Sequence, residues 1–465
     1  MHRGDAFFAL SGGHRDGAEF VAEALAHGAV AVITPGPATL EPVSEAATRV
    51  WATDPRLALA QAAASFHGHP SRRLKVVGVT GTNGKTTTTW LTESILRAAR
   101  IPAGVLGTTG YRFGDEVRPA PFTTPQAPEL QALLREMVEL GLEAVALEVS
   151  SHALEQRRSF GLEVDVAVFL NLSHDHLDYH GTLERYLDAK LMLFDGRNAP
   201  HSGKRATAVV NADDATFPMV RAAAARGGLA TLGYGAAPEA DLRLEAIAAT
   251  ARGLEFRLHD RGAMVAIELP LLGHYNAWNA AAAYGAARVL GIAPEVAVRG
   301  LALAPAVPGR LERIDRGQAF MVVVDYAHTP DALARALETM RAHVPGRVLV
   351  VFGCGGDRDR AKRPVMGRIA AAGADLGWIT NDNPRTEEPA SIAREIASGD
   401  PAGRLVTELD REAVIGLALA AARAGDGVLI AGKGHETTQT IGARVLPFDD
   451  RDVVRSGLDR LGGRR

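Results

Sequence analysis

The sequence predicts an α/β fold with several domains built on parallel sheets. Short β-branched runs alternate with alanine- and leucine-rich segments of helical pattern, and most runs end in Gly, Asn, Asp or Ser. That alternation is typical of βαβ units, in which functional residues gather at the carboxyl ends of the strands. At roughly 150 residues per domain, the 465 residues suggest about three domains.

The β-branched runs give the expected parallel strands. They lie at residues 74–79, 144–149, 164–170, 206–210, 321–324, 347–352 and 427–430. Residues 242–272 alternate more weakly, and we expect antiparallel strands there.

Two segments rich in turn-forming residues predict the domain boundaries. Residues 68–73 precede the first parallel strand and resemble a linker, and the proline-rich residues 304–310 precede a new strand run. We therefore expect domains at 1–69, 70–306 and 307–465.

Composition excludes several classes of protein. With 47% hydrophobic and 23% charged residues the chain is typical of a globular protein, and a net charge of −3 disfavours a general nucleic-acid or anionic-membrane binder. The single cysteine, Cys354, excludes an intrachain disulfide and a cysteine zinc site, and we expect a small packed side chain there. The apolar residues 6–10 are too few for a signal-peptide core, so we expect a cytoplasmic protein.

A glycine-rich segment after the first parallel strand predicts a phosphate-binding loop. Glycines let backbone N–H groups wrap a phosphate, and the N-terminus of the following helix, expected over 88–100, favours negative charge. Lys85 would reach the terminal phosphates, and the Thr86 hydroxyl would bind Mg²⁺. The strict spacing wants glycine where Val79 stands, so the segment is a variant, and a simple glycine-rich turn is the alternative.

Two further strand ends carry polar residues. Glu148 could hold Mg²⁺ or cap a helix, and the phosphate loop upstream favours the interpretation as a Mg²⁺ ligand. The His- and Asp-rich residues 171–180, which include His176, suit Mg²⁺ or phosphate contact, but a solvated polar loop is the alternative.

Lys190 stands out within a predicted helix. It falls on an apolar stripe at helical spacing, formed by Leu183, Tyr186, Leu187, Leu191 and Phe194. A charged lysine that points inward is costly unless it is paired or neutralised. Lys190 therefore either extends outward to solvent or has a functional partner or a modification that removes its positive charge.

The C-terminal third contains several polar motifs at strand ends. Asn276 and Asn279 precede an alanine-rich helix and could read an adenine edge or cap the helix. Four more motifs follow strand runs, at 325–331, 353–360, 380–385 and 432–436. Because the carboxyl ends of parallel strands meet at one sheet edge, we expect these four motifs to share a cleft.

Taken together and in this order, these motifs resemble the Mur ligase family, in its diaminopimelate-adding branch. The resemblance covers essentially the whole chain and rests on residues 78–87, 122–125, 148–152, 171–181, 190, 274–279, 325–330, 353–364, 382–385 and 432–436. It implies three domains: a small N-terminal UDP-binding α/β domain, a central P-loop-type ATPase with a parallel sheet, and a C-terminal Rossmann-like domain.

The resemblance also implies a reaction in peptidoglycan precursor synthesis. ATP, the co-substrate, phosphorylates the D-Glu carboxylate of UDP-N-acetylmuramoyl-L-alanyl-D-glutamate with Mg²⁺ as cofactor. The amine of meso-2,6-diaminopimelate then attacks the acyl phosphate. Lysine- or glutamate-adding ligases are alternatives, and so is a nucleotide-binding scaffold without catalysis. We expect a monomer whose partners are these small molecules, with no nucleic acid or membrane.

The resemblance to the Mur ligase family also implies which residues form each site. Catalysis is assigned to Lys85, Lys190 and His176. The metal ligands are Thr86, Glu148, His176 and carbamylated Lys190. ATP contacts are Gly81, Thr82, Asn83, Gly84, Lys85, Thr86, Thr87, Asn276, Asn279, Arg310 and Asp325. The UDP-muramoyl-dipeptide contacts are Gly12, Gly13, His14, Thr123, Thr124, Ser150, Gln156 and Arg158. Diaminopimelate contacts are Arg358, Asp382, Asn383, Pro384, Arg385, Gly432 and Glu436.

The N-terminal domain is expected to be short. The family usually begins with a longer segment containing a Ser-Arg pair that contacts uridine, and here Met1 falls just ahead of residues 4–10. Either the chain is truncated or its start is mis-assigned, and if these first residues are absent we expect weaker binding of the UDP-linked substrate. The identity of the amino acid depends on Arg358, Asp382 and Arg385, because arginines hold carboxylates in bidentate fashion and a carboxylate holds an ammonium.

Overall fold

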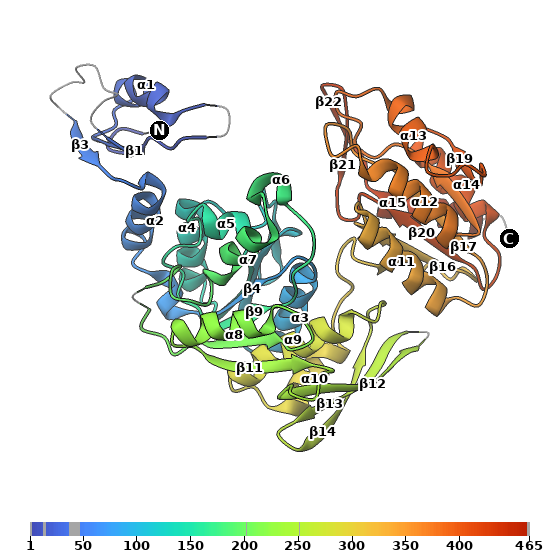
Figure 1. The fold of residues 1–465 in the computed structure, drawn as a ribbon, viewed down its shortest axis with the longest axis horizontal. Helices are drawn as coiled ribbons and strands as arrows, with labels where there is room; N and C mark the ends of the chain where they lie inside the picture. Colours follow the sequence, from blue (N-terminus) through green and yellow to red (C-terminus); the bar gives the residue numbers. More distant parts are fainter. Residues whose placement is uncertain (1, 13–14, 37–46, 201, 251, 463–465) are drawn as a thin grey trace. The chain divides into compact units, whose positions relative to one another are not determined.

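The computed structural model describes residues 2–12, 15–36, 47–200, 202–250 and 252–462. Contacts within the chain divide it into two compact units (Figure 1). The first comprises Met1–Arg243 with Ala281–Gly300, and the second comprises Leu244–Ala280 with Leu301–Arg465. Within the described ranges, no helix is both long and apolar enough to cross a bilayer.

A small parallel sheet with the order β1-β2-β3 forms the N-terminal region. Its elements are β1 (Ala6–Phe8), η1 (Gly17–Phe20), α1 (Val21–Ala26), β2 (Ala31–Thr34), β3 (Thr48–Trp51) and α2 (Pro55–Phe66). Asp16 starts η1 through a capping box with Glu19, which satisfies helix N–H groups that would otherwise lack partners. Ala9, Val21 and Val32 pack into a small core.

An eleven-stranded sheet follows, with the order β14-β13-β12-β11-β10-β9-β4-β8-β5-β6-β7. Its strands are β4 (Lys75–Thr80), β5 (Ala103–Gly107), β6 (Gly110–Phe113), β7 (Glu116–Arg118), β8 (Ala144–Glu148), β9 (Val166–Phe169), β10 (Thr207–Asn211), β11 (Ala230–Gly235), β12 (Leu242–Thr250), β13 (Gly253–Asp260) and β14 (Ala263–Leu269). β4 lies between β8 and β9, and both pairings are parallel. Val79 is in register with Glu148, and Thr80 with Phe169, so the three strands end at one edge.

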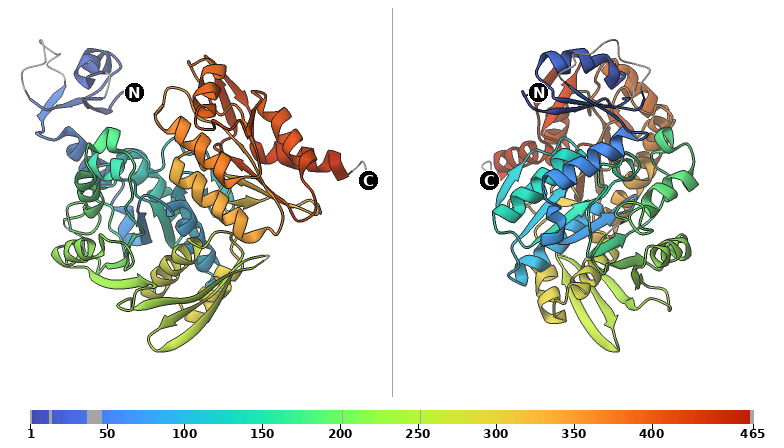
Figure 2. Two further views of the ribbon diagram at one scale, coloured as in Figure 1. Left: turned by 45° about the vertical axis from the view of Figure 1, so that its right-hand side comes forward. Right: turned by 90° about the vertical axis from the view of Figure 1, so that its left-hand side faces the viewer.

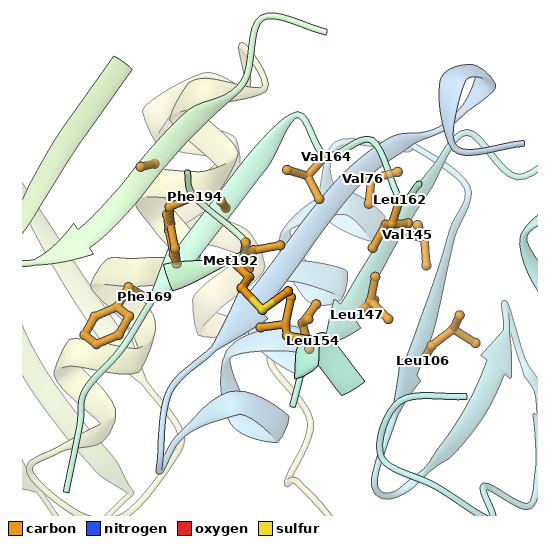
Figure 3. Close-up of a cluster of buried hydrophobic side chains, with 14 of the residues drawn as sticks. Val76, Leu106, Val145, Leu147, Leu154, Leu162, Val164, Phe169, Met192 and Phe194 are labelled. Carbon is orange, nitrogen blue, oxygen red and sulfur yellow. The ribbon is translucent and has the colours of Figure 1, made fainter. Parts of the chain in front are cut away.

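Helices cover both faces of this sheet, because its central strands are apolar on both sides. The helices are η3 (Pro70–Arg73), α3 (Lys85–Ala98), α4 (Ala127–Glu139), α5 (Ser151–Glu155), α6 (Leu177–His180), α7 (Leu183–Leu191), α8 (Phe217–Arg226), α9 (Asn276–Val289) and α10 (Pro294–Ala302). Figure 3 shows the core on one face, where Leu147 of β8 lies beside Leu154 and Met192, and Val145 of the same strand lies beside Leu162. The glycine Gly285 of α9 packs on Val209 of β10, whereas Val210 faces the core of Figure 3.

A six-stranded sheet with the order β15-β16-β20-β17-β18-β19 organises the C-terminal region. Its elements are β15 (Glu312–Arg313), β16 (Met321–Asp325), α11 (Pro330–His343), β17 (Val348–Phe352), α12 (Lys362–Gly373), β18 (Leu376–Ile379), α13 (Pro389–Ala397), β19 (Leu405–Thr407), α14 (Arg411–Ala421), β20 (Gly427–Ala431), β21 (Thr438–Ile441), β22 (Arg444–Pro447) and α15 (Asp450–Gly462). Helices α11, α12 and α13 cover one face, and α14 and α15 cover the other (Figure 2). Only β15 pairs antiparallel in this sheet, and the other strands are parallel.

The structure confirms the expected parallel strands to within two residues at each end, and β13 and β14 form the expected antiparallel pair. The segment predicted as a linker contains the short helix η3, whose Ser71 is fully buried. One detail of the sequence interpretation is wrong. The apolar stripe around Lys190 is shorter than predicted, because Leu183 is 40% exposed and α7 ends at Leu191.

Candidate functional site

The predicted phosphate loop joins β4 to α3, so the strand–loop–helix order is the one that the sequence predicts. Gly84 has φ +89°, a left-handed conformation that favours glycine, and α3 begins at the next residue. The ammonium of Lys85 folds back over the loop and donates to the carbonyl oxygens of Gly81 and Thr82, both at 2.8 Å. This places a cation against the backbone that would wrap a phosphate.

Beside the loop, the Glu148 carboxylate is buried at the end of β8. The Thr86 hydroxyl donates to Oε1 of Glu148 at 2.9 Å, and the Thr108 N–H donates to the same oxygen at 2.8 Å. Gly107 leaves room for this carboxylate, because a Cβ at that position would collide with Glu148. A hydroxyl and a carboxylate in contact are hard oxygen ligands, the type that Mg²⁺ prefers.

His176 has a left-handed backbone (φ +54°) and caps α6. Its ring lies 4.9 Å from the ring of His152 and 6.0 Å from that of Tyr186, measured between centroids. Burial lowers the pKa of His176, Asp175 raises it, and the nearby cations lower it further. The imidazole is therefore more often neutral than a free histidine, as a metal ligand must be.

Lys190 is only 1% exposed, so the alternative in which it extends to solvent is wrong. Its Nζ donates to the Gly81 carbonyl oxygen at 2.9 Å and lies 4.3 Å from the centre of the Tyr186 ring. Burial and the charge of Lys85 hold the pKa of Lys190 well below its usual value, and Asp175 only partly opposes them. The ammonium of Lys190 therefore loses its proton more readily than that of an exposed lysine, which makes this side chain a better nucleophile.

Among the residues that the structure describes, no group of three or more His, Cys, Asp or Glu side chains is arranged so that it could hold a metal ion. The predicted ligands Glu148, Thr86, His176 and Lys190 are of mixed type, so they fall outside such a group. Their roles stay predictions.

Four of the residues assigned to the UDP-muramoyl-dipeptide are joined by hydrogen bonds. The Thr124 hydroxyl donates to Ser150 Oγ at 3.3 Å, and Arg158 donates to the Thr124 carbonyl oxygen at 3.5 Å. Arg158 also donates to Oε1 of Gln156, at 2.9 Å through Nε. Thr123 lies nearby, where its hydroxyl is 3.1 Å from that of Thr108. The structure therefore gathers these side chains beside Glu148, whose carbonyl accepts from Thr124.

Of the three residues assigned to the N-terminal loop, Gly12 donates its N–H to the Arg15 carbonyl. Gly13 and His14 lie outside the described residues.

Asn276 and Asn279 lie in the first turn of α9, where both are buried. Asn276 donates to the Leu272 carbonyl at 2.6 Å, and Asn279 donates to Oδ1 of Asn276 at 2.7 Å. Their amides therefore hold the start of the helix.

Arg310 and Asp325 flank the turn after β16. The Arg310 guanidinium stacks 4.9 Å from the centre of the Tyr326 ring. Asp325 accepts from the N–H groups of Leu311 (2.6 Å) and Ala327 (2.8 Å). Burial raises the pKa of Asp325, while these two hydrogen bonds and Arg310 oppose the rise.

The four strand-end motifs of the C-terminal unit meet at one edge of its sheet, as the sequence predicts. A Cβ at Gly432 would lie 2.6 Å from Oδ2 of Asp382, and a Cβ at Gly434 would lie 2.7 Å from Cβ of Tyr326. A Cβ at Gly353 would collide with the Thr380 carbonyl oxygen. These close approaches explain why glycines follow the strands here.

The residues assigned to diaminopimelate lie along this edge. Asn383, which precedes Pro384, donates to Oε2 of Glu436 at 2.7 Å. Arg385 has φ +52° and donates to the Gly356 carbonyl at 2.7 Å. A Cβ at Gly355 would lie 2.9 Å from Nη1 of Arg385 and 3.8 Å from Cγ of Arg358, so both arginine side chains pass close to this glycine. The edge thus carries two arginines and two carboxylates, Asp382 and Glu436.

Sequence reasoning missed Lys433 and Arg363, which are both fully buried. Arg363 donates to Glu387 and Glu395 and ties the loops around Arg358 and Arg385 together. Lys433 lies between Gly432 and Gly434 in a segment already singled out. The flanking glycines let the chain pass closely against its neighbours, but one acceptor of Lys433 is Asn383 in another loop, so the sequence does not show that this lysine is buried.

Three family models match the chain. They are described as Mur ligase family, catalytic domain (residues 1–67), Mur ligase middle domain (79–287), and Mur ligase, glutamate ligase domain (309–434). The chain belongs to the Mur ligase family. The resemblance and the three-domain α/β fold expected from the motifs are therefore confirmed, and as a Mur ligase the chain is an ATP-dependent, amide-forming enzyme.

Several Mur ligases are similar along nearly the whole chain. A protein of Solibacter usitatus named UDP-N-acetylmuramoyl-L-alanyl-D-glutamate–2,6-diaminopimelate ligase is 47% identical over 98% of this chain and 91% of its own length. The protein of the same name from Geobacillus kaustophilus is 44% identical over 99% and 93%. A solved structure of a ligase of that name has a TM-score of 0.73 at 36% identity, over 99% of this chain and 93% of the other. A more distant Mur ligase, from Thermotoga maritima, shares the fold at 22% identity with a TM-score of 0.64, over 100% of this chain and 96% of its own.

Proposed function

We propose that this Mur ligase joins meso-2,6-diaminopimelate to UDP-N-acetylmuramoyl-L-alanyl-D-glutamate at the expense of ATP. The observation that carries the proposal is the match over nearly the whole chain, at 47% identity, to a ligase whose name states these substrates. We propose that the reaction takes place in the cytoplasm, where ATP is available, and that it supplies a peptidoglycan precursor.

The proposed reaction has two steps. The D-Glu carboxylate attacks the γ-phosphorus of ATP, so that an acyl phosphate forms and ADP leaves. The amine of the amino acid then attacks the acyl carbon, and phosphate leaves as the amide bond forms. Lys85, whose ammonium already lies against the loop carbonyls, would stabilise the charge that develops on the transferred phosphoryl group.

Magnesium fits the oxygen ligands beside the loop. Thr86 and Glu148 are in contact, both are buried, and His176 with a lowered pKa is proposed to add a neutral ligand. When bound, Mg²⁺ neutralises charge on the phosphate oxygens. Glu148 is held in place for this role by the Thr108 N–H and hydroxyl.

Lys190 is proposed to be carbamylated. Its neutral Nζ would attack the carbon of CO₂, and the released proton would leave to solvent. The product is an anion in place of a buried cation, and its oxygens could bind a cation beside the loop. The single hydrogen bond that Lys190 makes, to a carbonyl, supports this because it leaves the ammonium without a carboxylate partner in the described structure.

The UDP-muramoyl-dipeptide is assigned to the hydrogen-bonded residues around Thr124. Arg158 is proposed to hold a carboxylate or phosphate, and Thr123, Ser150 and Gln156 to hold the peptide. Asn276, Asn279, Arg310 and Asp325 are proposed to contact adenine and ribose.

The amino-acid site is assigned to the sheet edge of the C-terminal unit. Diaminopimelate carries a carboxylate and an ammonium at its far end. Arg358 and Arg385 would pair with the carboxylate, and Asp382 and Glu436 with the ammonium. L-Lysine has the distal ammonium without the carboxylate, so it would leave an arginine without an anion.

The test is a ligation assay with a panel of amino acids. Phosphate release and product mass are followed with UDP-muramoyl-dipeptide and ATP held at saturation. We expect meso-diaminopimelate to give the highest kcat/KM and L-lysine to fall roughly a hundredfold or more below it, because L-lysine lacks the carboxylate that would make charge-assisted hydrogen bonds to Arg358 and Arg385. A preference for lysine or glutamate would overturn the proposal. ATP hydrolysis that needs neither substrate would favour a scaffold.

A further inference from the structure

Lys433 has no role in the assignments above, yet it is fully buried beside residues assigned to the amino-acid substrate. An ammonium has three donors and no acceptor. Each of the three has an acceptor here: Oε2 of Glu436 at 3.0 Å, Oδ1 of Asn383 at 3.3 Å and the Thr438 carbonyl oxygen at 2.7 Å. The charge is thus paired and fully hydrogen-bonded, which is what makes burial of a lysine affordable.

The backbone is built to turn this lysine inward. Gly432 and Gly434 have φ +114° and +54°, a region that favours glycine. A Cβ at Gly432 would lie 2.6 Å from Asp382 Oδ2, and a Cβ at Gly434 would lie 2.7 Å from the Gly309 carbonyl oxygen. The chain therefore passes closely between two neighbours at these positions, and only the residue between them can carry a long side chain.

The contacts form a closed ring. Asn383 donates its amide to Oε2 of Glu436 at 2.7 Å and accepts on Oδ1 from both Lys433 and the Thr440 N–H. Oε2 of Glu436 therefore accepts two hydrogen bonds, and within the described residues Oε1 accepts none. Lys433 and Asn383 together hold one oxygen of the carboxylate and leave the other available.

We propose that Lys433 is a positioning residue for the amino-acid substrate. It fixes the carboxylate of Glu436 so that Oε1 is aimed at the substrate ammonium, and it fixes Asn383 through Oδ1. Lys433 itself touches no substrate. The inference rests on the proposed function in one respect only, which is the assignment of Glu436 to the amino-acid site.

The positive charge of Lys433 has an effect opposite to its positioning effect. A cation beside Glu436 lowers the attraction of that carboxylate for a second cation, so removal of Lys433 could in principle strengthen ammonium binding. A carboxylate without its partners is also free to rotate and would have to be ordered when substrate binds. The ring predicts that the ordering effect wins, because Lys433 and Asn383 together fix one oxygen.

The experiment compares Lys433→Met, Lys433→Gln, Glu436→Gln and the double variant Lys433→Met/Glu436→Gln in the full-length enzyme. The amino acid used is the one that gives wild type its highest kcat/KM in the panel, so that failure of the diaminopimelate assignment does not affect this test. KM and kcat are measured separately for the amino acid, ATP and UDP-muramoyl-dipeptide. Arg347→Met is the matched control, because Arg347 pairs with the buried Asp426 in the same unit but takes no part in the site.

The expected result is a roughly tenfold or larger rise in amino-acid KM for Lys433→Met, with KM for ATP changed less than about twofold. In the double variant the rise should equal that of Glu436→Gln alone, because Lys433 acts through Glu436. Arg347→Met should lower the unfolding temperature and leave amino-acid KM unchanged.

Three results would overturn the proposal: an amino-acid KM that falls or stays unchanged, KM values for all three substrates that rise together, or effects that multiply in the double variant. Lys433→Gln keeps a hydrogen-bond donor and should give an intermediate KM. It decides the question if Lys433→Met does not fold, since a wild-type KM in a folded Lys433→Gln variant contradicts the role.

Discussion

Replacement of Lys190 by methionine separates a carbamylated lysine from an ordinary buried one. Methionine keeps the length and packing of the side chain but removes the amine. Lys190 is 1% exposed, and among the residues that the structure describes its only hydrogen-bond partner is the Gly81 carbonyl oxygen. An ammonium in this place is poorly compensated, so its removal should leave the fold at least as stable. Activity should fall roughly a hundredfold or more, the size of effect expected when a metal ligand or its support is lost.

The pH dependence follows from the lowered pKa of Lys190. The unfolded chain binds a proton up to its usual pKa of 10.5, whereas the folded protein releases that proton at a lower pH. Between the folded pKa and 10.5 the unfolded state therefore binds more protons, and folding stability rises with pH by up to about 1.4 kcal/mol per pH unit. The free energy of unfolding of wild type relative to Lys190→Met should therefore rise as the pH is raised toward 10.5, and both proteins are compared by urea unfolding in CO₂-free buffer.

The carbamate itself is read directly by carbon-13 NMR after bicarbonate labelled with carbon-13 is added. We expect a carbamate signal in wild type and none in Lys190→Met, and bicarbonate should raise the stability and activity of wild type only. Lys204→Met is the control, because Lys204 is paired with Asp165 at 2.6 Å, outside the site. Active wild type without a carbamate signal, or parallel pH–stability profiles for the two proteins, would refute the reasoning.

Three further predictions concern other residues. Lys85→Met should lower kcat by roughly a thousandfold with an unchanged circular dichroism spectrum, because the residue acts on developing charge, and near-normal turnover at saturating ATP would contradict this. Arg158→Met should raise KM for the UDP-muramoyl-dipeptide roughly tenfold and leave KM for ATP unchanged, since its bonds to Gln156 would be lost with it; equal rises in both KM values would count against the assignment. Burial raises the pKa of the Cys354 thiol to about 12, so iodoacetamide should not alkylate the folded enzyme at pH 8 and should alkylate it after urea unfolding, as mass spectrometry would show.

Sequence patterns predicted the strands well because each is short, apolar and bounded by turn-forming residues. The helix carrying Lys190 was harder. Its apolar spacing predicted a stripe that included Leu183 and Phe194, but Leu183 is exposed at the first turn and Phe194 lies beyond the helix. Spacing alone does not say where a helix stops, because the end depends on packing with the sheet.

Lys433 and Arg363 escaped sequence reasoning for a different physical reason. A lysine or arginine is usually exposed, so its type gives no sign of burial. Their burial depends on acceptors that are close in space, such as Asn383 for Lys433 and Glu387 for Arg363, which come from other loops of the sheet edge. Only the fold brings these acceptors together.

The fold also brings two lysines to one oxygen. Because β8, β4 and β9 are parallel and in register, the loop after β4 lies at the edge where Glu148 and Asn171 follow their strands. Helix α7 then returns Lys190 to this edge, and its Nζ (2.9 Å) and that of Lys85 (2.8 Å) donate to the same Gly81 carbonyl oxygen. Two ammonium groups around one oxygen repel each other, and the repulsion is strongest in a buried place. A lower pKa of one of the two lysines relieves this repulsion, and burial and the charge of Lys85 lower the pKa of Lys190. The proposed role of Lys85 in phosphoryl transfer needs a cation, whereas the proposed carbamylation of Lys190 would remove a positive charge and turn repulsion between the two side chains into attraction.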